Sequence, residues 1–197
     1  AVILTALGLL VIGFYIWISY SGNIHEVIPG TVIRSAQLNP RQLNQVLNRY
    51  RIRSIIDMSP GNKLHNKELQ FSRTHHIRHF DLGINVHGFC PPNELLKLTQ
   101  LIETAPKPLL VHCRQGIDRT GLASAIAAIL YSSDLRTIKK QISYRYADMW
   151  PTSVGIKTIT KYIAWCQQQR LSLNKHTFTS WINSLTNGKM INALPLQ

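Results

Sequence analysis

The chain has 197 residues, of which 45% are hydrophobic and 16% are charged, and its formal net charge is +13. This length suits one compact domain, and this composition excludes a disordered chain. The positive charge favours anionic partners such as phosphorylated ligands or lipid headgroups, whereas no aromatic–basic motif indicates a nucleic-acid partner.

The first twenty residues are uncharged and apolar, and they have about the length that a helix needs to cross a bilayer. Tyr15, Trp17 and Tyr20 cluster at the far end, as an interfacial aromatic belt would. No small-residue cleavage site follows, which disfavours a signal peptide, and the run lacks the polar face of a core helix. We therefore expect a transmembrane anchor over residues 1–21 and a single-pass membrane protein.

The orientation of that anchor is read from the charges that follow it. Lys and Arg are abundant after the anchor, which favours the cytoplasmic face of the membrane. A whole folded domain can cross a membrane regardless of its charge, so the periplasmic face stays open as the alternative.

Strand and helix patterns alternate along the remaining chain. We expect strands over residues 31–34, 54–58, 77–84 and 108–111. We expect helices from Asn39-Pro40, between Pro92 and Pro106, and over 121–131, 135–146 and 153–169. Residues 62–76 show only a polar, basic stretch. The alternation predicts an α/β fold with a central, mainly parallel sheet flanked by helices.

Two boundaries divide the expected chain. The anchor is followed by one domain over residues 22–175. A basic tail with a short helix over 178–185 is expected over residues 176–197, because residues 149–197 hold five Lys or Arg and no Asp or Glu.

The chain has three cysteines, at positions 90, 113 and 166. A small and odd number of cysteines argues against a disulfide framework. A single Cys90–Cys166 bridge stays open. A loose group of histidines, at positions 65, 75, 76, 79 and 87, fits no common metal-ligand spacing. We therefore expect neither a metal nor another cofactor.

The segment that carries chemistry is residues 111–121, VHCRQGIDRTG. A predicted strand delivers Cys113 to a loop, and a helix begins where the loop ends. Successive backbone N–H groups of such a loop can form an anion-binding nest, and the helix N-terminus adds unpaired donors. Gly116 permits a backbone conformation that a side chain resists. We expect a phosphate-binding loop made of Arg114, Gln115, Gly116, Ile117, Asp118 and Arg119.

Cys113 and Arg119 are the expected reactive pair in this loop. The surrounding N–H groups and positive charge can hold Cys113 as a thiolate, which is the nucleophilic form. The planar fork of Arg119 can hold two phosphate oxygens at once, which Lys cannot do. His112 is expected to hold the loop in shape, and the Thr120 hydroxyl to assist the sulfur as a leaving group.

The pattern His-Cys-x-x-Gly-x-x-Arg-Thr-Gly resembles the signature loop of the protein tyrosine and dual-specificity phosphatase superfamily. Residues 27–38 and 54–59 also resemble bacterial dual-specificity-like phosphatases, so the resemblance spans roughly residues 24–170. It implies the cysteine-phosphatase fold and metal-free hydrolysis in two steps. Cys113 would be the nucleophile and Arg119 the phosphate clamp.

The resemblance also implies a general acid, usually an Asp on a mobile loop before the cysteine. Asp81 lies 32 residues before Cys113, but it falls within a predicted strand. Asp118 is the rival, since some bacterial and lipid-directed relatives carry Gly-x-Asp-Arg in this loop. We favour Asp118 slightly, and keep Asp81 and His87 as alternatives.

The resemblance leaves the substrate open. Phosphotyrosine, phosphoserine or phosphothreonine in proteins is the first expectation. The alternative is a phosphoinositide or another phospholipid headgroup, which the anchor, the basic tail and Arg114 favour. A binding module without turnover is disfavoured by the intact Cys113 and Arg119.

Overall fold

The computed structural model describes residues 2–186, and its centre is a five-stranded sheet. The strands lie in the order β1-β2-β5-β3-β4, with β1 antiparallel to β2 and the other neighbours parallel. The mainly parallel sheet confirms the predicted fold class. The strands are β1 (His25–Ile28), β2 (Val32–Ala36), β3 (Ser54–Asp57), β4 (Arg78–Asp81) and β5 (Leu109–Cys113).

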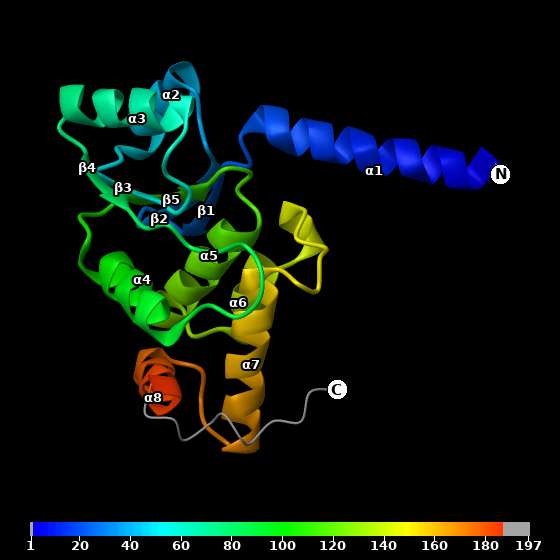
Figure 1. Ribbon diagram of the computed structural model, residues 1–197, viewed down its shortest axis with the longest axis vertical. Coiled ribbons are helices and arrows are strands. Elements are labelled where there is room, and N and C mark those ends of the chain that lie inside the picture. The colour runs from blue at the N-terminus through cyan, green and yellow to red at the C-terminus, as the bar shows by residue number, and fades with distance from the viewer. Residues whose placement is uncertain (1, 187–197) are drawn as a thin grey trace.

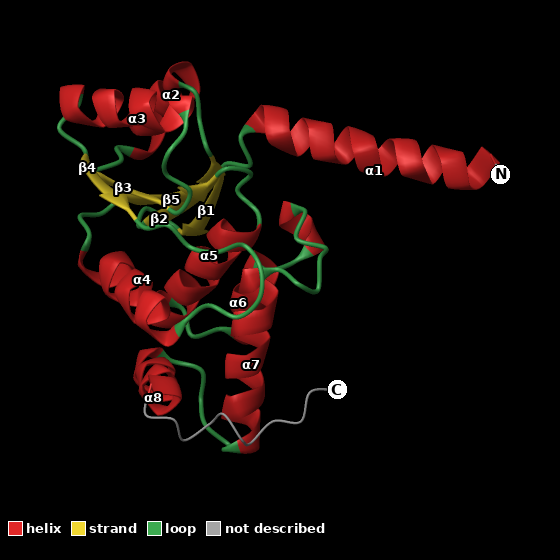
Figure 2. Cartoon of the chain, viewed as in Figure 1, coloured by secondary structure: helices red, strands yellow, loops and turns green. Residues whose placement is uncertain are grey.

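Helices cover both faces of this sheet (Figures 1 and 2). Two short helices lie on one face, α2 (Pro40–Tyr50) and α3 (Lys63–Thr74). The other face carries α4 (Pro92–Thr104), α5 (Asp118–Tyr131), α6 (Leu135–Gln141), α7 (Val154–Gln168) and α8 (Lys175–Thr186). A 3-10 turn, η1 (Tyr144–Tyr146), follows α6.

Alternating side chains of the buried strands build two cores. Ile33, Ile55 and Leu110 face α2 and α3, whereas their neighbours Val32, Ile56 and Val111 face the helices on the other side. This alternation follows from the strand geometry, in which successive side chains point to opposite faces. Helices cover both faces of the sheet, so the three central strands β2, β3 and β5 are buried throughout, whereas the edge strand β4 is partly exposed.

Most predicted elements are found with small shifts, and two elements were not predicted. The helix predicted over 135–146 ends at Gln141 and is followed by the 3-10 turn η1, and the strand predicted over 77–84 is shortened to Arg78–Asp81. The helix from Asn39 is confirmed down to its cap, because Asn39 accepts from the Gln42 N–H in a capping box. The helix α3 was missed because its buried face is polar: His65, Glu68 and Ser72 take the places of apolar residues. The edge strand β1 was missed as well, being only four residues long.

The helix α8 packs into the main core. Phe178, Trp181 and Ile182 are all buried there, and the rings of Phe178 and Trp181 also contact Tyr162 of α7. This helix begins at Lys175 and is longer than the short helix that the sequence predicts. The remainder of the predicted basic tail, residues 187–197, lies outside the described residues.

The helix α1 (Val2–Ser21) extends away from the rest of the molecule (Figure 1). Its last turns join the domain, since Ile18 is buried against Ile117 and Ala147, and Gln42 Nε2 donates to the carbonyl of Tyr20. Among the helices within residues 2–186, none has the length and apolar character needed to cross a bilayer. The transmembrane anchor predicted from the uncharged run of residues 1–20 is therefore not supported.

Candidate active site

The predicted phosphate-binding loop joins β5 to α5. The strand β5 lies between β2 and β3 and ends on Cys113, and α5 begins five residues later at Asp118. The residue before α5, Ile117, provides no side-chain cap. The first N–H groups of α5 are therefore left to bind an anion, and the helix dipole favours that charge.

Gly116 fixes the tight path of this loop. Its φ is +70°, a left-handed conformation that side chains rarely adopt. A Cβ at this position would lie 2.5 Å from the backbone nitrogen of Ala36 and 2.7 Å from the carbonyl of Ser35. The loop can thus lie directly on β2 only because residue 116 has no side chain.

Two buried side chains hold the loop from behind by binding the Gly116 carbonyl. Asn23 Nδ2 and Arg34 Nη2 each donate to this oxygen at 2.9 Å. Arg34 also donates to the backbone carbonyl of Gln141, and its guanidinium lies 3.9 Å from the centroid of the Tyr146 ring. Sequence reasoning did not assign these roles, although an Arg inside the apolar run of β2 was a visible signal.

The sulfur of Cys113 lies in surroundings that favour its ionised form. Burial alone would raise the pKa of this thiol. A hydrogen bond from the Thr120 hydroxyl, the charge of Arg119 and the N–H groups of Thr120 and Ile117 oppose burial, and together they lower the pKa below its usual value. Two backbone N–H groups, one hydroxyl and one guanidinium charge thus act on the sulfur.

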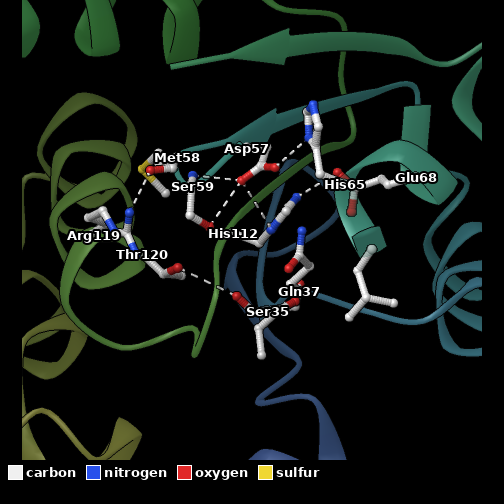
Figure 3. A network of polar contacts seen from close by, with 12 residues as sticks. Ser35, Gln37, Asp57, Met58, Ser59, His65, Glu68, His112, Arg119 and Thr120 are labelled. Atoms are coloured by element: carbon white, nitrogen blue, oxygen red, sulfur yellow. Dashed lines mark hydrogen bonds and ion pairs between the residues drawn. The ribbon is translucent and has the colours of Figure 1, made fainter. Parts of the chain in front are cut away.

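Arg119 is held in place by backbone carbonyls. Its Nη1 donates to the carbonyl of Met58 at 3.0 Å, shown in Figure 3, and to that of Ile84 at 3.4 Å. Its Nε is buried and has no hydrogen-bond partner among the described residues. A buried donor without a partner is costly, so this N–H is available to a bound oxyanion.

Asp118 lies at the opening of the site, in the first turn of α5. It lines two neighbouring pockets of about 460 and 360 Å³, together with Gln115 and Trp150. His87 lines the smaller pocket, and its loop is tied to the chain after Trp150 by the bond from Val154 N to Val86 O. Two of the three candidate acids, Asp118 and His87, are thus brought together beside the loop.

Asp81, the third candidate, is engaged elsewhere. Its carboxylate lies at the end of β4 against two imidazoles, 3.3 Å from His79 Nδ1 and 3.6 Å from His65 Nε2. It does not line either of the pockets that Asp118 lines. Of the three candidate acids, Asp118 and His87 therefore line pockets beside the loop, whereas Asp81 does not.

A buried polar network supports the other side of the loop (Figure 3). His112 Nε2 lies 2.9 Å from Glu68 Oε1. Burial opposes charge on both groups, but the carboxylate raises the pKa of His112 and the imidazole lowers that of Glu68. Asp57 Oδ1 accepts from the N–H of Ser59 at 2.7 Å, next to the Met58 carbonyl that holds Arg119.

The other two cysteines lie apart from this loop. Cys90 and Cys166 are buried free thiols, so the structure contains no bridge between them. Burial raises the pKa of both thiols, to about 12 for Cys90, which keeps them protonated and unreactive.

Comparisons with known proteins agree with this arrangement. The model of the "Tyrosine phosphatase family" matches residues 91–151, which include the whole loop. No curated protein sequence matches the chain.

Solved structures share the fold. The core catalytic domain of the PP-IP phosphatase SIW14 of S. cerevisiae is 22% identical, with a TM-score of 0.60 over 89% of this chain and 96% of that one. P. aeruginosa TpbA is 19% identical, with a TM-score of 0.53 over 66% and 78%. PTPMT1, solved with PI(5)P, is 15% identical, with a TM-score of 0.57 over 73% and 98%. At these identities the likeness shows the fold alone.

A helix-flanked, mainly parallel sheet thus delivers a cysteine of lowered pKa to a loop that is followed by Arg119. The match of the family model and the shared fold support hydrolysis of a phosphoester. The chain thus shares the fold of these phosphatases, and its loop region matches the tyrosine phosphatase family model, which agrees with the resemblance seen in the sequence.

Proposed function

We propose that the protein is a phosphomonoesterase that works through a phosphocysteine on Cys113. The observation that carries this proposal is the lowered pKa of a cysteine enclosed by the amides of Ile117 and Thr120 and the charge of Arg119. In the first step the thiolate attacks phosphorus and the ester P–O bond breaks. The leaving oxygen takes a proton from Asp118, while Arg119 and the loop amides stabilise the charge on the remaining oxygens.

The second step returns the enzyme to its starting state. Water attacks the phosphocysteine, the S–P bond breaks, and inorganic phosphate leaves. The Asp118 carboxylate accepts the proton of the water, and the hydroxyl of Thr120 stabilises the departing sulfur by its hydrogen bond. Arg114 and Gln115 are exposed in the loop and can contact the part of the substrate beyond the phosphate.

Phosphorylated proteins are the first substrate class in this proposal, and lipid headgroups are the second. A specific observation favours the second: apolar side chains from distant segments, Val11, Met149 and Trp150, line the larger pocket beside Asp118. The preceding segment forms a basic pocket with Arg136, Lys139, Lys140 and Arg145 among its lining residues. An apolar rim beside a cationic surface suits a phosphorylated headgroup with an acyl chain.

Phosphate release by the purified full-length chain tests both parts of the proposal. The substrates are an aryl phosphate, phosphotyrosine and phosphoserine/threonine peptides, phosphoinositides and phosphatidylglycerophosphate. We expect Cys113→Ser to lose at least about 1,000-fold in kcat, whereas the matched Cys90→Ala variant retains turnover because Cys90 lies in the core. Turnover by Cys113→Ser equal to that of the unmodified chain would remove the covalent mechanism, and the ranking of kcat/KM decides the substrate class.

A further inference from the structure

We propose that His65, His79 and Asp81 form a binding site for one Zn²⁺ ion at the carboxyl end of β3 and β4. The ligand atoms of these three residues all lie within 4.8 Å of one another. Two imidazoles and one carboxylate are a ligand set that divalent transition metals favour. The three ligands lie outside the cysteine loop, although Asp57 and Glu68 behind them also contact His112 of β5, and the proposal does not rest on the proposed function.

Two buried carboxylates fix which nitrogen each imidazole presents. Asp57 Oδ2 lies 2.9 Å from His65 Nδ1, and Glu68 Oε1 lies 2.7 Å from His79 Nε2. A carboxylate can only accept, so each of these nitrogens donates its hydrogen. In the neutral imidazoles, the opposite nitrogens, Nε2 of His65 and Nδ1 of His79, carry the free lone pairs. Histidines that bind metals are typically oriented in this way by a carboxylate behind them.

Both free nitrogens point at the same carboxylate. His79 Nδ1 lies 3.3 Å from Asp81 Oδ1, and His65 Nε2 lies 3.6 Å from Asp81 Oδ2. A lone pair facing a carboxylate oxygen is repulsive, and either a proton or a metal ion between the two atoms relieves this repulsion. Two ligands held about 2.05 Å from a tetrahedral zinc ion are separated by about 3.3 Å, which agrees with these distances.

The imidazole of His79 supplies a second observation, the burial of its Nδ1. Its side chain is only 7% exposed, and its Nδ1 makes no hydrogen bond to any residue that the structure describes. A buried polar atom without a partner is costly, and this one points towards Asp81. The Asp81 side chain is 44% exposed, so an ion can reach the site from solvent and keep water as a further ligand.

The local charge also favours a bound cation. Three carboxylates, those of Asp57, Glu68 and Asp81, lie among the imidazoles, and two of these carboxylates are fully buried. The histidine spacing in the sequence did not predict a metal, because His65 lies on α3 while His79 and Asp81 lie on β4. Only the folded chain brings the three together.

The test is Zn²⁺ binding by the full chain in a Cys113→Ser background, where the reactive thiolate cannot compete for the metal. The protein is stripped with a chelator and titrated with Zn²⁺ against a chromophoric competitor, and bound metal is counted by mass spectrometry. We expect one Zn²⁺ per chain with submicromolar affinity and a rise in Tm on binding. Co²⁺ in place of Zn²⁺ should give the visible absorption of a tetrahedral site.

Three substitutions locate the site. Asp81→Asn and His79→Gln should each weaken Zn²⁺ binding at least about 100-fold, and Glu68→Gln, behind His79, about 10–100-fold. His176→Gln, an exposed histidine on α8, should bind as the parent does. Because Asp81 is half-exposed, its Asn variant should fold even if His79→Gln does not. No stoichiometric binding at about 10 μM Zn²⁺, or equal binding by the parent and Asp81→Asn, would overturn the proposal.

Discussion

Gly116 shows how strongly one residue constrains the reactive loop. A Cβ here meets the backbone of β2 at 2.5 Å, and φ is +70°. Gly30 is a matched control, since its φ is +65° but a Cβ added there would have nothing within 4 Å. We expect Gly30→Ala to cost about 1–2 kcal/mol of stability with kcat retained.

Gly116→Ala adds a displacement of the loop to this backbone strain. We expect its kcat to fall at least about 100-fold, because a shift of about 1 Å at a catalytic group costs that much. Steady-state kinetics and chemical denaturation of both variants measure the two effects. Equal kcat values for the two alanine variants would mean that the loop does not depend on this close contact.

The thiol of Cys113 carries a pH dependence with a defined sign. Its pKa is lowered, so the thiolate is lost only as the pH falls through that lowered value. Thr120→Val removes a hydrogen bond that favours the thiolate, and should move the midpoint of Cys113 alkylation to higher pH. The rate of iodoacetamide modification, read at the Cys113 peptide by mass spectrometry, measures the midpoint.

The control for this shift is Thr160→Val, because the Thr160 hydroxyl bonds only the carbonyls of its own helix, α7. Its alkylation profile should overlay that of the unmodified chain. If the alkylation profile of Thr120→Val also overlays that of the unmodified chain, the Thr120 hydroxyl does not stabilise the Cys113 thiolate.

The identity of the general acid is also decided by single residues. Loss of the true acid should slow the hydrolysis of alkyl phosphates, whose leaving groups are poor, by about 100- to 10,000-fold. The hydrolysis of aryl phosphates should slow far less. We expect Asp118→Asn to show this difference, since Asp118 lines the pockets beside the loop. Asp81→Asn should leave the ratio of the two rates unchanged. The opposite pattern would assign the acid to Asp81.

At the scale of elements, the sequence predicts what depends on local patterns. The helix from Asn39 carries its own cap, and β5 is an apolar run that leads into the signature loop, so both are visible without the fold. The helix α3 could not be predicted, because its buried residues His65 and Glu68 are polar. Their partners, Asp57 of β3 and His112 of β5, lie on strands far away in the sequence. The same reason hid the support of Arg34 for the loop, which requires β2 and α6 to meet.

The helix α8 provides an element-scale test of where the domain ends. Trp181 is 1% exposed in the main core, although the sequence places it in a tail. We expect Trp181→Ala to lower the free energy of unfolding by about 3–5 kcal/mol. The exposed neighbour Asn183, replaced by Ala, should change it by less than about 0.5 kcal/mol. Urea denaturation measures both free energies. An equally small effect of Trp181→Ala would mean that α8 is not part of the folded core.

At the scale of the whole molecule, the α/β class and the cysteine loop could be predicted, whereas the surroundings of the loop could not. Asn23, Arg34 and Glu68 lie 45 to 90 residues from Cys113 in the chain, and only the sheet order brings them to it. The predicted anchor had the right composition locally, but the structure does not support a span. Apart from the anchor, features that depend on one segment were predicted better than those that depend on assembly.

The central claim is that the sulfur of Cys113 takes the phosphoryl group onto itself. The most direct measurement is an acid quench during turnover with a labelled aryl phosphate, followed by peptide mapping of the label. We predict phosphate on the Cys113 peptide, formed and lost at rates that account for turnover, and none in Cys113→Ser. Full turnover with no label on the protein, or label on a different residue, would contradict it.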